Sequence, residues 1–215
     1  MAKVETFLRM PFHNKLNLLH QIWRRYIGVV YYRRIFGSFG AGSVLYKPML
    51  LSNTQYMDIG KNVLIREGAR IELVIIDPDN PPSLHIEDNV NIEQNVHIVV
   101  LGKMRVKKDS TIASHCSFLC GNHPFFDVTN PIKIGDRLTG ANSFIEIGPR
   151  SLIGVGTVVQ MNVCIGEYVV VGSNSVVKKS IPDFSVADGN PARVILQYEK
   201  ESDRWIPRKQ HSLEQ

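Results

Sequence analysis

An apolar residue recurs at every sixth position from residue 147 to residue 177, and this period constrains the fold more than any other feature. The positions are Ile147, Ile153, Val159, Ile165, Val171 and Val177. A period of six matches neither the 3.6-residue repeat of an α-helix nor the two-residue alternation of a strand. Because hexapeptide repeats are typical of a parallel β-helix, we predict an all-β solenoid.

Each hexapeptide supplies one short strand and one corner, so three of them form one triangular coil. The leading aliphatic residue should point into the prism, and the glycine that often follows it should let the chain turn at the corner. A small or β-branched residue at the fifth place should fill the rest of the interior: Ser151, Thr157, Val163, Val169 and Ser175. One coil cannot bury its own core, so stability must come from stacked neighbours.

The same period extends upstream with interruptions. Further blocks open at Ile59, Ile65, Ile86, Ile92, Ile98, Val106, Ile112 and Phe118, with a two-residue offset at Met104-Arg105. We predict that residues 76–83, which interrupt the period, form a loop. The period fails again over residues 121–131, and a weakly periodic segment begins after it at Ile134. Long loops in compact folds are usually functional, so we expect the segment 121–131 to protrude and to carry chemistry.

We divide the chain into three segments, residues 1–42, 43–196 and 197–215. The first is basic and aromatic, with an apolar stripe at helical spacing after Pro11. We expect it to form a helical cap on the solenoid or an anchor at an anionic membrane face. The second segment is the solenoid, and the third is predicted to be a short helix and a tail.

Charge and cysteine content limit the possible partners. The 25 Lys and Arg residues exceed the 20 Asp and Glu residues, but the excess lies within the first 36 residues. The rest is nearly balanced, which argues against a nucleic-acid-binding body. Cys116, Cys120 and Cys164 have no paired spacing, which favours free thiols in a reducing cytoplasm. Cys116 and Cys120 beside His115 lack the further ligands of a metal site, so we expect no metal.

The segment IGPRSLIGVGTVVQMNVCIGEYVVVGSNSVVKKSIPDFSVADGNPARVI closely resembles the hexapeptide-repeat acyltransferases. This family includes maltose, galactoside and polysaccharide O-acetyltransferases. The resemblance covers roughly residues 59–195, and its most specific part is the ending SVVKKSIPDFSVADGNPARVI. It implies a left-handed parallel β-helix, a homotrimer, and acetyl-CoA as the acyl donor in the groove between neighbouring prisms.

The resemblance also implies site residues. His123, within Gly121-Asn122-His123-Pro124, matches the catalytic histidine of the family. The positions that correspond to CoA-binding elements are Val155, Ser173, Lys178, Lys179 and Arg193. Leu152 stands where many members have tryptophan, and residues 134–146 are additional, which implies a different acceptor pocket.

Acetyl transfer from a thioester to a sugar hydroxyl needs a base that takes the hydroxyl proton and donors that stabilise the oxyanion. Neutral histidine suits the base, so His123 is the candidate and His115 the alternative. A carboxylate or a carbonyl would orient the ring, and the possible carboxylates are Asp127 in the same loop and Glu146 beyond it.

We therefore expect an O-acetyltransferase that modifies a sugar of a surface polysaccharide or its precursor. The nearest alternative is an N-acyltransferase that acts on an amino sugar nucleotide with the same base. More remote alternatives are a non-catalytic solenoid and a zinc carbonic anhydrase. The latter needs three converging histidines, for which the candidates are His85, His97, His115 and His123. We expect no nucleic acid as partner. If the N-terminal segment is an anchor rather than a cap, it would make peripheral contact with the inner face of the membrane.

Overall fold

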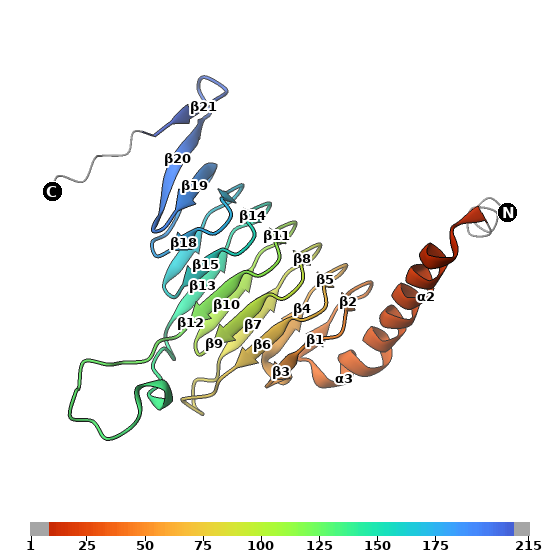
Figure 1. The fold of residues 1–215 in the computed structure, drawn as a ribbon, viewed down its shortest axis with the longest axis horizontal. Helices are drawn as coiled ribbons and strands as arrows, with labels where there is room; N and C mark the ends of the chain where they lie inside the picture. Colours follow the sequence, from red (N-terminus) through yellow and green to blue (C-terminus); the bar gives the residue numbers. More distant parts are fainter. Residues whose placement is uncertain (1–8, 209–215) are drawn as a thin grey trace.

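The protein is a three-sided stack of coils, seen from the side in the computed structural model of Figure 1, which describes residues 9–208. Three sheets, here called A, B and C, form the sides. Strands of neighbouring coils pair in parallel throughout the stack. The prediction of an all-β parallel solenoid is therefore confirmed.

Sheets A and C have six strands each. Sheet A contains β1 (Ser38–Phe39), β4 (Met57–Ile59), β7 (Ser83–Ile86), β10 (Lys103–Val106), β13 (Phe144–Ile147) and β16 (Val163–Ile165). Sheet C contains β3 (Leu50–Ser52), β6 (Arg70–Leu73), β9 (His97–Val100), β12 (Ser117–Cys120), β15 (Val158–Gln160) and β18 (Val176–Val177).

Sheet B has nine strands. Its parallel part contains β2 (Val44–Leu45), β5 (Leu64–Ile65), β8 (Asn91–Ile92), β11 (Thr111–Ile112), β14 (Leu152–Ile153), β17 (Val170–Val171) and β19 (Ser185–Gly189). Two antiparallel strands, β20 (Ala192–Glu199) and β21 (Arg204–Pro207), follow.

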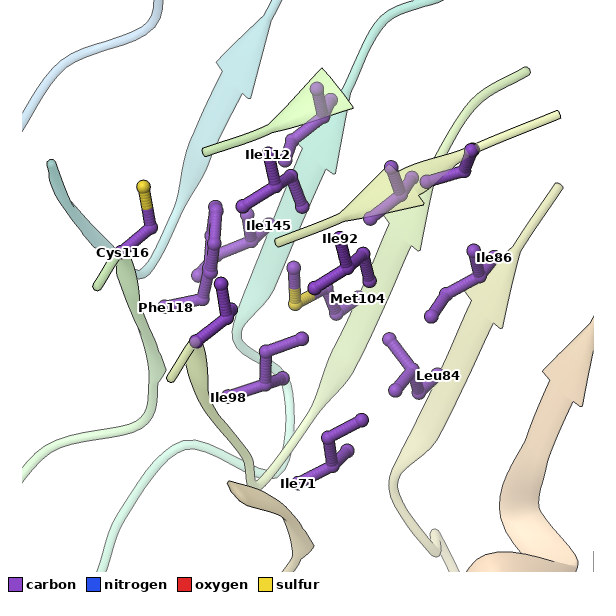
Figure 2. Packing of buried hydrophobic residues seen from close by; sticks show 14 of the residues in the cluster. Ile71, Leu84, Ile86, Ile92, Ile98, Met104, Ile112, Cys116, Phe118 and Ile145 are labelled. Atoms are coloured by element: carbon purple, nitrogen blue, oxygen red, sulfur yellow. The ribbon is translucent and has the colours of Figure 1, made fainter. Parts of the chain in front are cut away.

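The hexapeptide period is confirmed by burial. The aliphatic residues that open the blocks between residues 147 and 177 are at most 1% exposed, and the fifth-place residues are also buried. Figure 2 shows Ile92, Ile112 and Ile145 pointing into one interior. The buried hydroxyls are satisfied across coils, since Ser151 Oγ donates to the carbonyl of Gly166 at 2.9 Å.

The two-residue offset at Met104 has a simple cause. In β10 both Met104 and Val106 point inward, because side chains two apart in a strand share a face. Met104 therefore continues the series from Ile98, and Val106 opens the next one, without any break in the stack.

The chain turns at the corners through residues with a left-handed backbone conformation. At the edge between sheets B and C, Asn95, His115 and Asn174 have φ values of 57°, 61° and 58°. Asparagine tolerates this left-handed region better than most residues, which explains its recurrence at the corners.

Both inserts leave the prism at the edge between sheets C and A. The first spans residues 74–82, close to the prediction, and the second spans 121–143 rather than 121–131. The piece that begins at Ile134 does not resume the coil. Ile134 is half exposed and starts a short 3-10 helix, η3 (Ile134–Asp136), because β13 takes the place in sheet A.

The N-terminal segment is helical, as predicted. It comprises α2 (Phe12–Ile27), a π-helical turn η1 (Gly28–Tyr32) and α3 (Arg33–Ile35); a further 3-10 turn, η2 (Thr54–Tyr56), precedes β4. Tyr32, Phe36 and Phe39 are buried in the core cluster and close the first coil with their rings. In contrast, α2 buries none of its residues, and Figure 1 shows it leaning away from the stack.

The predicted C-terminal helix is wrong. The described part of the segment forms the end of β20 and all of β21, which add to sheet B as an antiparallel hairpin. The open edge of β19 offers unpaired backbone groups to the next strand. The cross-strand pair of Tyr198 and Trp205 stabilises the hairpin further, whereas a short isolated helix is only marginally stable in water. Residues 209–215 of the predicted tail lie outside the described residues. Among residues 9–208, no helix has the length and apolar content needed to cross a bilayer.

Candidate active site

The long insert, which we call the histidine loop (residues 121–143), is pinched at its base. Asn122 and Thr139 exchange two backbone hydrogen bonds, of 2.9 and 3.0 Å. Gly140 sits beside this pair with a φ of 135°, and an added Cβ there would lie 2.9 Å from the Cα of Gly121. The neck therefore needs glycine, and it holds the beginning and the end of the loop together.

His123 projects from the loop directly after this neck. Its Nδ1 lies 3.0 Å from the carbonyl oxygen of Arg137, and its backbone N–H donates to Asn122 Oδ1. A carbonyl can only accept, so Nδ1 must carry the hydrogen, which leaves the lone pair of the neutral ring on Nε2. The ring is exposed, and Nε2 is therefore the atom that can accept a proton from a substrate.

Arg137 organises the loop around this histidine. Its guanidinium donates three hydrogen bonds to loop carbonyls, those of Ile132 at 2.7 Å, Asn130 at 2.8 Å and Asp127 at 2.9 Å. The same residue thus fixes the loop through its side chain and orients the histidine through its carbonyl. Sequence reasoning missed Arg137, because nothing in its sequence context separates it from other surface arginines.

The sequence left a carboxylate or a carbonyl open as the group that orients His123, and the structure has a carbonyl at Nδ1. Asp127 Oδ1 accepts hydrogen bonds from the hydroxyl and the backbone N–H of Thr129, and these bonds, the hydroxyl's first, hold the pKa of Asp127 below its usual value. Glu146 lies in β13 and pairs with Lys107 at 2.7 Å. Both carboxylates are thus engaged elsewhere, and the backbone carbonyl takes the orienting position.

The outer part of the loop is apolar. Phe125 and Phe126 stack with ring centroids 4.4 Å apart, and Phe126 is 85% exposed. Val128 and Ile132 are also exposed. The rings therefore stack on each other rather than on the prism, and they leave a flat aromatic surface two to three residues from the candidate base.

The predicted CoA-binding residues are exposed and lie in three places. Val155 and Ser173 follow β14 and β17, at the edge between sheets B and C. Lys178 and Lys179 follow β18, at the edge between sheets C and A that also carries the histidine loop. Arg193 stands on β20, opposite Asp188.

The structure therefore brings some of these residues together and separates others. Lys178 and Lys179 share an edge with His123, two coils further along. Val155 and Ser173 lie at the opposite edge of sheet C, in which a four-residue strand such as β12 spans about 13 Å. Between the two edges lies an outward apolar strip of three residues, Leu119, Val158 and Val176. Val158 pairs with Val176, and Leu119, which is 36% exposed, lies diagonally across from Val158 because its direct partner is Gln160.

This geometry bears on His115 as an alternative base and on a metal site formed by histidines or cysteines. His115 precedes β12 and His123 follows it, so they occupy opposite edges of sheet C. Cys116 and Cys120 are buried, and burial raises the pKa of Cys116 to about 11. Within residues 9–208, no group of three or more His, Cys, Asp or Glu side chains is arranged to hold a metal ion.

The curated proteins that resemble this chain include several named as acetyltransferases or acyltransferases. No family model matches the chain. A protein of Escherichia coli K12 named as a lipopolysaccharide biosynthesis O-acetyl transferase, WbbJ, is 31% identical over 162 residues, which are 74% of this chain and 80% of that protein. The E. coli protein WcaF, named as a colanic acid biosynthesis acetyltransferase, is 33% identical over 64% of this chain and 67% of its own length. A third E. coli relative, a dTDP-4-amino-4,6-dideoxy-D-glucose acyltransferase, is 26% identical over 65% of this chain and 73% of its own.

Solved structures share the fold. The N-acyltransferase AntD of Bacillus cereus, in complex with dTDP and 3-hydroxybutyryl-CoA, superposes with a TM-score of 0.64 at 19% identity, over 79% of this chain and 87% of AntD. A hexapeptide-repeat acetyltransferase of Vibrio cholerae, VCA0836, in complex with acetyl-CoA, has a TM-score of 0.51 at 20% identity, over 79% and 75%. With the repeats, the coil and the O-acetyltransferase relatives, these findings show that the chain belongs to the hexapeptide-repeat acyltransferases.

Proposed function

We propose that the protein moves an acetyl group from acetyl-CoA to a hydroxyl of a sugar in a surface polysaccharide or its precursor, with His123 as general base. The observation that carries the proposal is the hydrogen bond from His123 Nδ1 to the carbonyl of Arg137, because it leaves Nε2 free to take a proton. Support for the acceptor comes from the two relatives named for lipopolysaccharide and colanic acid biosynthesis.

In the proposed reaction, Nε2 of His123 takes the hydroxyl proton while the sugar oxygen forms a bond to the thioester carbonyl carbon. The carbon–sulfur bond then breaks, and the departing CoA thiolate receives the proton from the imidazolium. The sugar gains an acetyl ester, CoA leaves as a thiol, and the histidine returns to its neutral state. The exposed rings of Phe125 and Phe126 offer a stacking surface for the acceptor sugar.

We place the acyl donor against Val155, Ser173, Lys178, Lys179 and Arg193. The lysines would act as point charges on the phosphates of CoA, and Arg193 could pair with a phosphate in a bidentate manner. We also propose that the coil is left-handed and that three chains assemble around one axis. A flat sheet C cannot enclose the reacting atoms by itself, whereas a second copy against its apolar strip would convert it into the wall of a groove.

The three cysteines are free, and two of them are buried as thiols. This supports the reducing cytoplasm as the place of the reaction, where disulfides are rare.

An N-acyltransferase that acts on an amino sugar nucleotide is the second candidate. It is favoured by the relative that acylates a dTDP-linked amino sugar and by the fold shared with AntD. The same histidine could serve either acceptor, so the products must decide. An acetyl ester is cleaved by mild alkali, whereas an amide is stable under these conditions.

The test measures CoA release from acetyl-CoA across a panel of sugars, polysaccharides and amino sugar nucleotides. We expect His123→Ala to lower kcat/KM by about 100-fold or more, the usual contribution of a general base. The matched control is His115→Asn, because Asn95 occupies the equivalent corner one coil earlier with a similar φ. The control should keep full activity. Unchanged turnover in His123→Ala would refute the assignment, and acetyl-CoA that fails to raise the melting temperature would refute the donor.

A further inference from the structure

The helix α2 turns a mainly polar side toward the solenoid, and its last residue, Ile27, packs against the core. The His20 ring meets the Tyr46 ring edge-on, with centroids 5.9 Å apart. Gln21 and Arg25 line a hollow of about 200 Å³ between the helix and strands β2 and β5. A helix that served only as a cap would bury its apolar side here, as Tyr32 does further along.

The apolar side of α2 consequently faces away from the protein. Its stripe continues into η1 at spacings of three and four residues, and its members are 38–75% exposed: Phe12, Leu16, Leu19, Trp23, Tyr26 and Val30. Ile22 and Val29, also more than half exposed, widen the stripe on one side. Such a continuous exposed patch on one element indicates an interaction surface.

The charge around this surface has one sign. Residues 6–57 contain no aspartate or glutamate. The cations within α2 to α3 are Lys15, Arg24, Arg25, Arg33 and Arg34. The partner that complements an apolar stripe on a helix whose charged residues are all cations is a surface that is apolar inside and anionic outside.

We propose that α2 lies in the interface of an anionic phospholipid membrane, with its apolar stripe among the acyl chains and its cations at the phosphate groups. The helix is about 24 Å long at 1.5 Å per residue, so it is suited to lie along the interface. The stacked pair Trp23 and Tyr26 has the amphipathic character of interfacial side chains. This inference does not rest on the acyltransferase reaction.

A second copy of the chain fits the same surface less well. The stripe has the a/d spacing of a coiled coil, but it spans slightly less than three heptads, and its last member, Val30, already lies in the π-helical turn η1. Coiled coils sustain the pattern over at least three to four heptads. Coiled coils also pair opposite charges beside the seam, whereas helices from several copies would bring cations together without any acidic partner. Membrane lipid supplies the missing negative charge.

The experiment uses the full chain with Trp205→Phe, so that Trp23 is the only tryptophan. The probes are vesicles of phosphatidylcholine alone, or with 30% phosphatidylglycerol, and a third set brominated on the acyl chains. We expect sedimentation with the anionic vesicles only. Trp23 emission should shift to shorter wavelength there and be quenched by the brominated lipid, and binding should weaken as salt is raised.

Two variants test the cations and the apolar stripe of α2 separately. Arg24→Gln/Arg25→Gln/Arg34→Gln should weaken vesicle binding by roughly 100-fold, given the usual contribution of each cation. Leu16→Ser/Leu19→Ser should remove the shift of Trp23 emission. Matched controls elsewhere are Lys200→Gln/Arg204→Gln and the exposed pair Met49→Ser/Leu50→Ser, which should bind as the parent does.

Circular dichroism and thermal unfolding verify that each variant is folded. If the folded parent fails to sediment with anionic vesicles, or if binding is the same in the α2 variants and the controls, the proposal is refuted. A change in subunit number caused by Leu16→Ser/Leu19→Ser, without any vesicle binding by the parent, would refute it in favour of a second copy. Acetyl transfer is measured in parallel, so that loss of membrane binding is distinguished from loss of activity.

Discussion

Arg137 links the shape of the histidine loop to the orientation of His123, the proposed base. The guanidinium of Arg137 donates to three loop carbonyls that would otherwise bind only water. The backbone carbonyl of the same residue accepts the hydrogen bond from His123 Nδ1. A displacement of about 1 Å at a reacting group can lower a rate 100-fold. We therefore propose Arg137 as a positioning residue, whose side chain would act on the reaction through His123.

We predict that Arg137→Ala lowers kcat by about 10- to 100-fold and leaves the KM for acetyl-CoA nearly unchanged, because the residues proposed to bind the donor lie outside the loop. Arg137→Lys should restore only part of the rate, since lysine cannot serve three carbonyls in a planar fork. The matched control is Lys133→Ala, an exposed cation of the same loop that pairs with Asp136. A large rise in KM with normal kcat would contradict the positioning role.

The candidate base could be named from the sequence, but the group that contacts its Nδ1 could not. His123 was identifiable because it stands where a strict period fails, within a motif shared with the family. Its orienting group is a backbone carbonyl 14 residues further on, and every residue carries such a carbonyl. Only the pinched neck at Asn122 and Thr139 selects that one, and the neck is a tertiary feature.

At the level of elements, each strand is stable through its neighbours in the adjacent coils. The strands of sheet B are mostly two residues long, with one side chain pointing in and one pointing out. In β8, Ile92 is fully buried and Asn91 is exposed. Adjacent residues on one short strand therefore differ completely in their share of the folding free energy.

We predict that Ile92→Ala lowers the free energy of unfolding by about 2–5 kcal/mol, from lost transfer free energy and the cavity that is left. Asn91→Ala should change it by less than about 0.5 kcal/mol. Both values are measured by urea unfolding followed by circular dichroism. Equal effects at the two positions would contradict the inward register of the repeat.

The elements that sequence reasoning placed correctly are those with a period, and the errors lie where the period ends. Residues 192–207 alternate weakly, and as an isolated peptide they could form a helix or a hairpin. The open edge of β19 decides in favour of the hairpin, because its backbone groups pair with β20. The longer histidine loop has the same cause, since Ile134 looks like the start of a repeat but the position in sheet A belongs to Ile145.

At the scale of the whole molecule, the proposed site is divided between two edges of sheet C. The histidine loop occupies one edge, and Ser173 the other. If three chains pack around an axis, the loop of one copy can face the Ser173 edge of its neighbour. Neither edge then forms a complete site within its own chain.

We predict that His123→Ala and Ser173→Trp each abolish activity, the second by filling the exposed donor edge, and that chains carrying the two changes partly restore it when co-expressed. A mixed trimer would contain interfaces with one intact loop and one intact edge. Light scattering should give three times the chain mass of 24.3 kDa. Absence of any restored activity in verified mixed trimers would mean that each chain holds its own site.

The ends of the stack have a consequence of their own. A parallel coil has no intrinsic length limit, since each end presents strand edges that another identical molecule could continue, as in a growing filament. Here the first coil is closed by the rings of Tyr32, Phe36 and Phe39, and sheet B ends in strands of reversed direction. These two endings hinder end-to-end stacking of further molecules, so the number of coils is set by the sequence rather than by polymerisation.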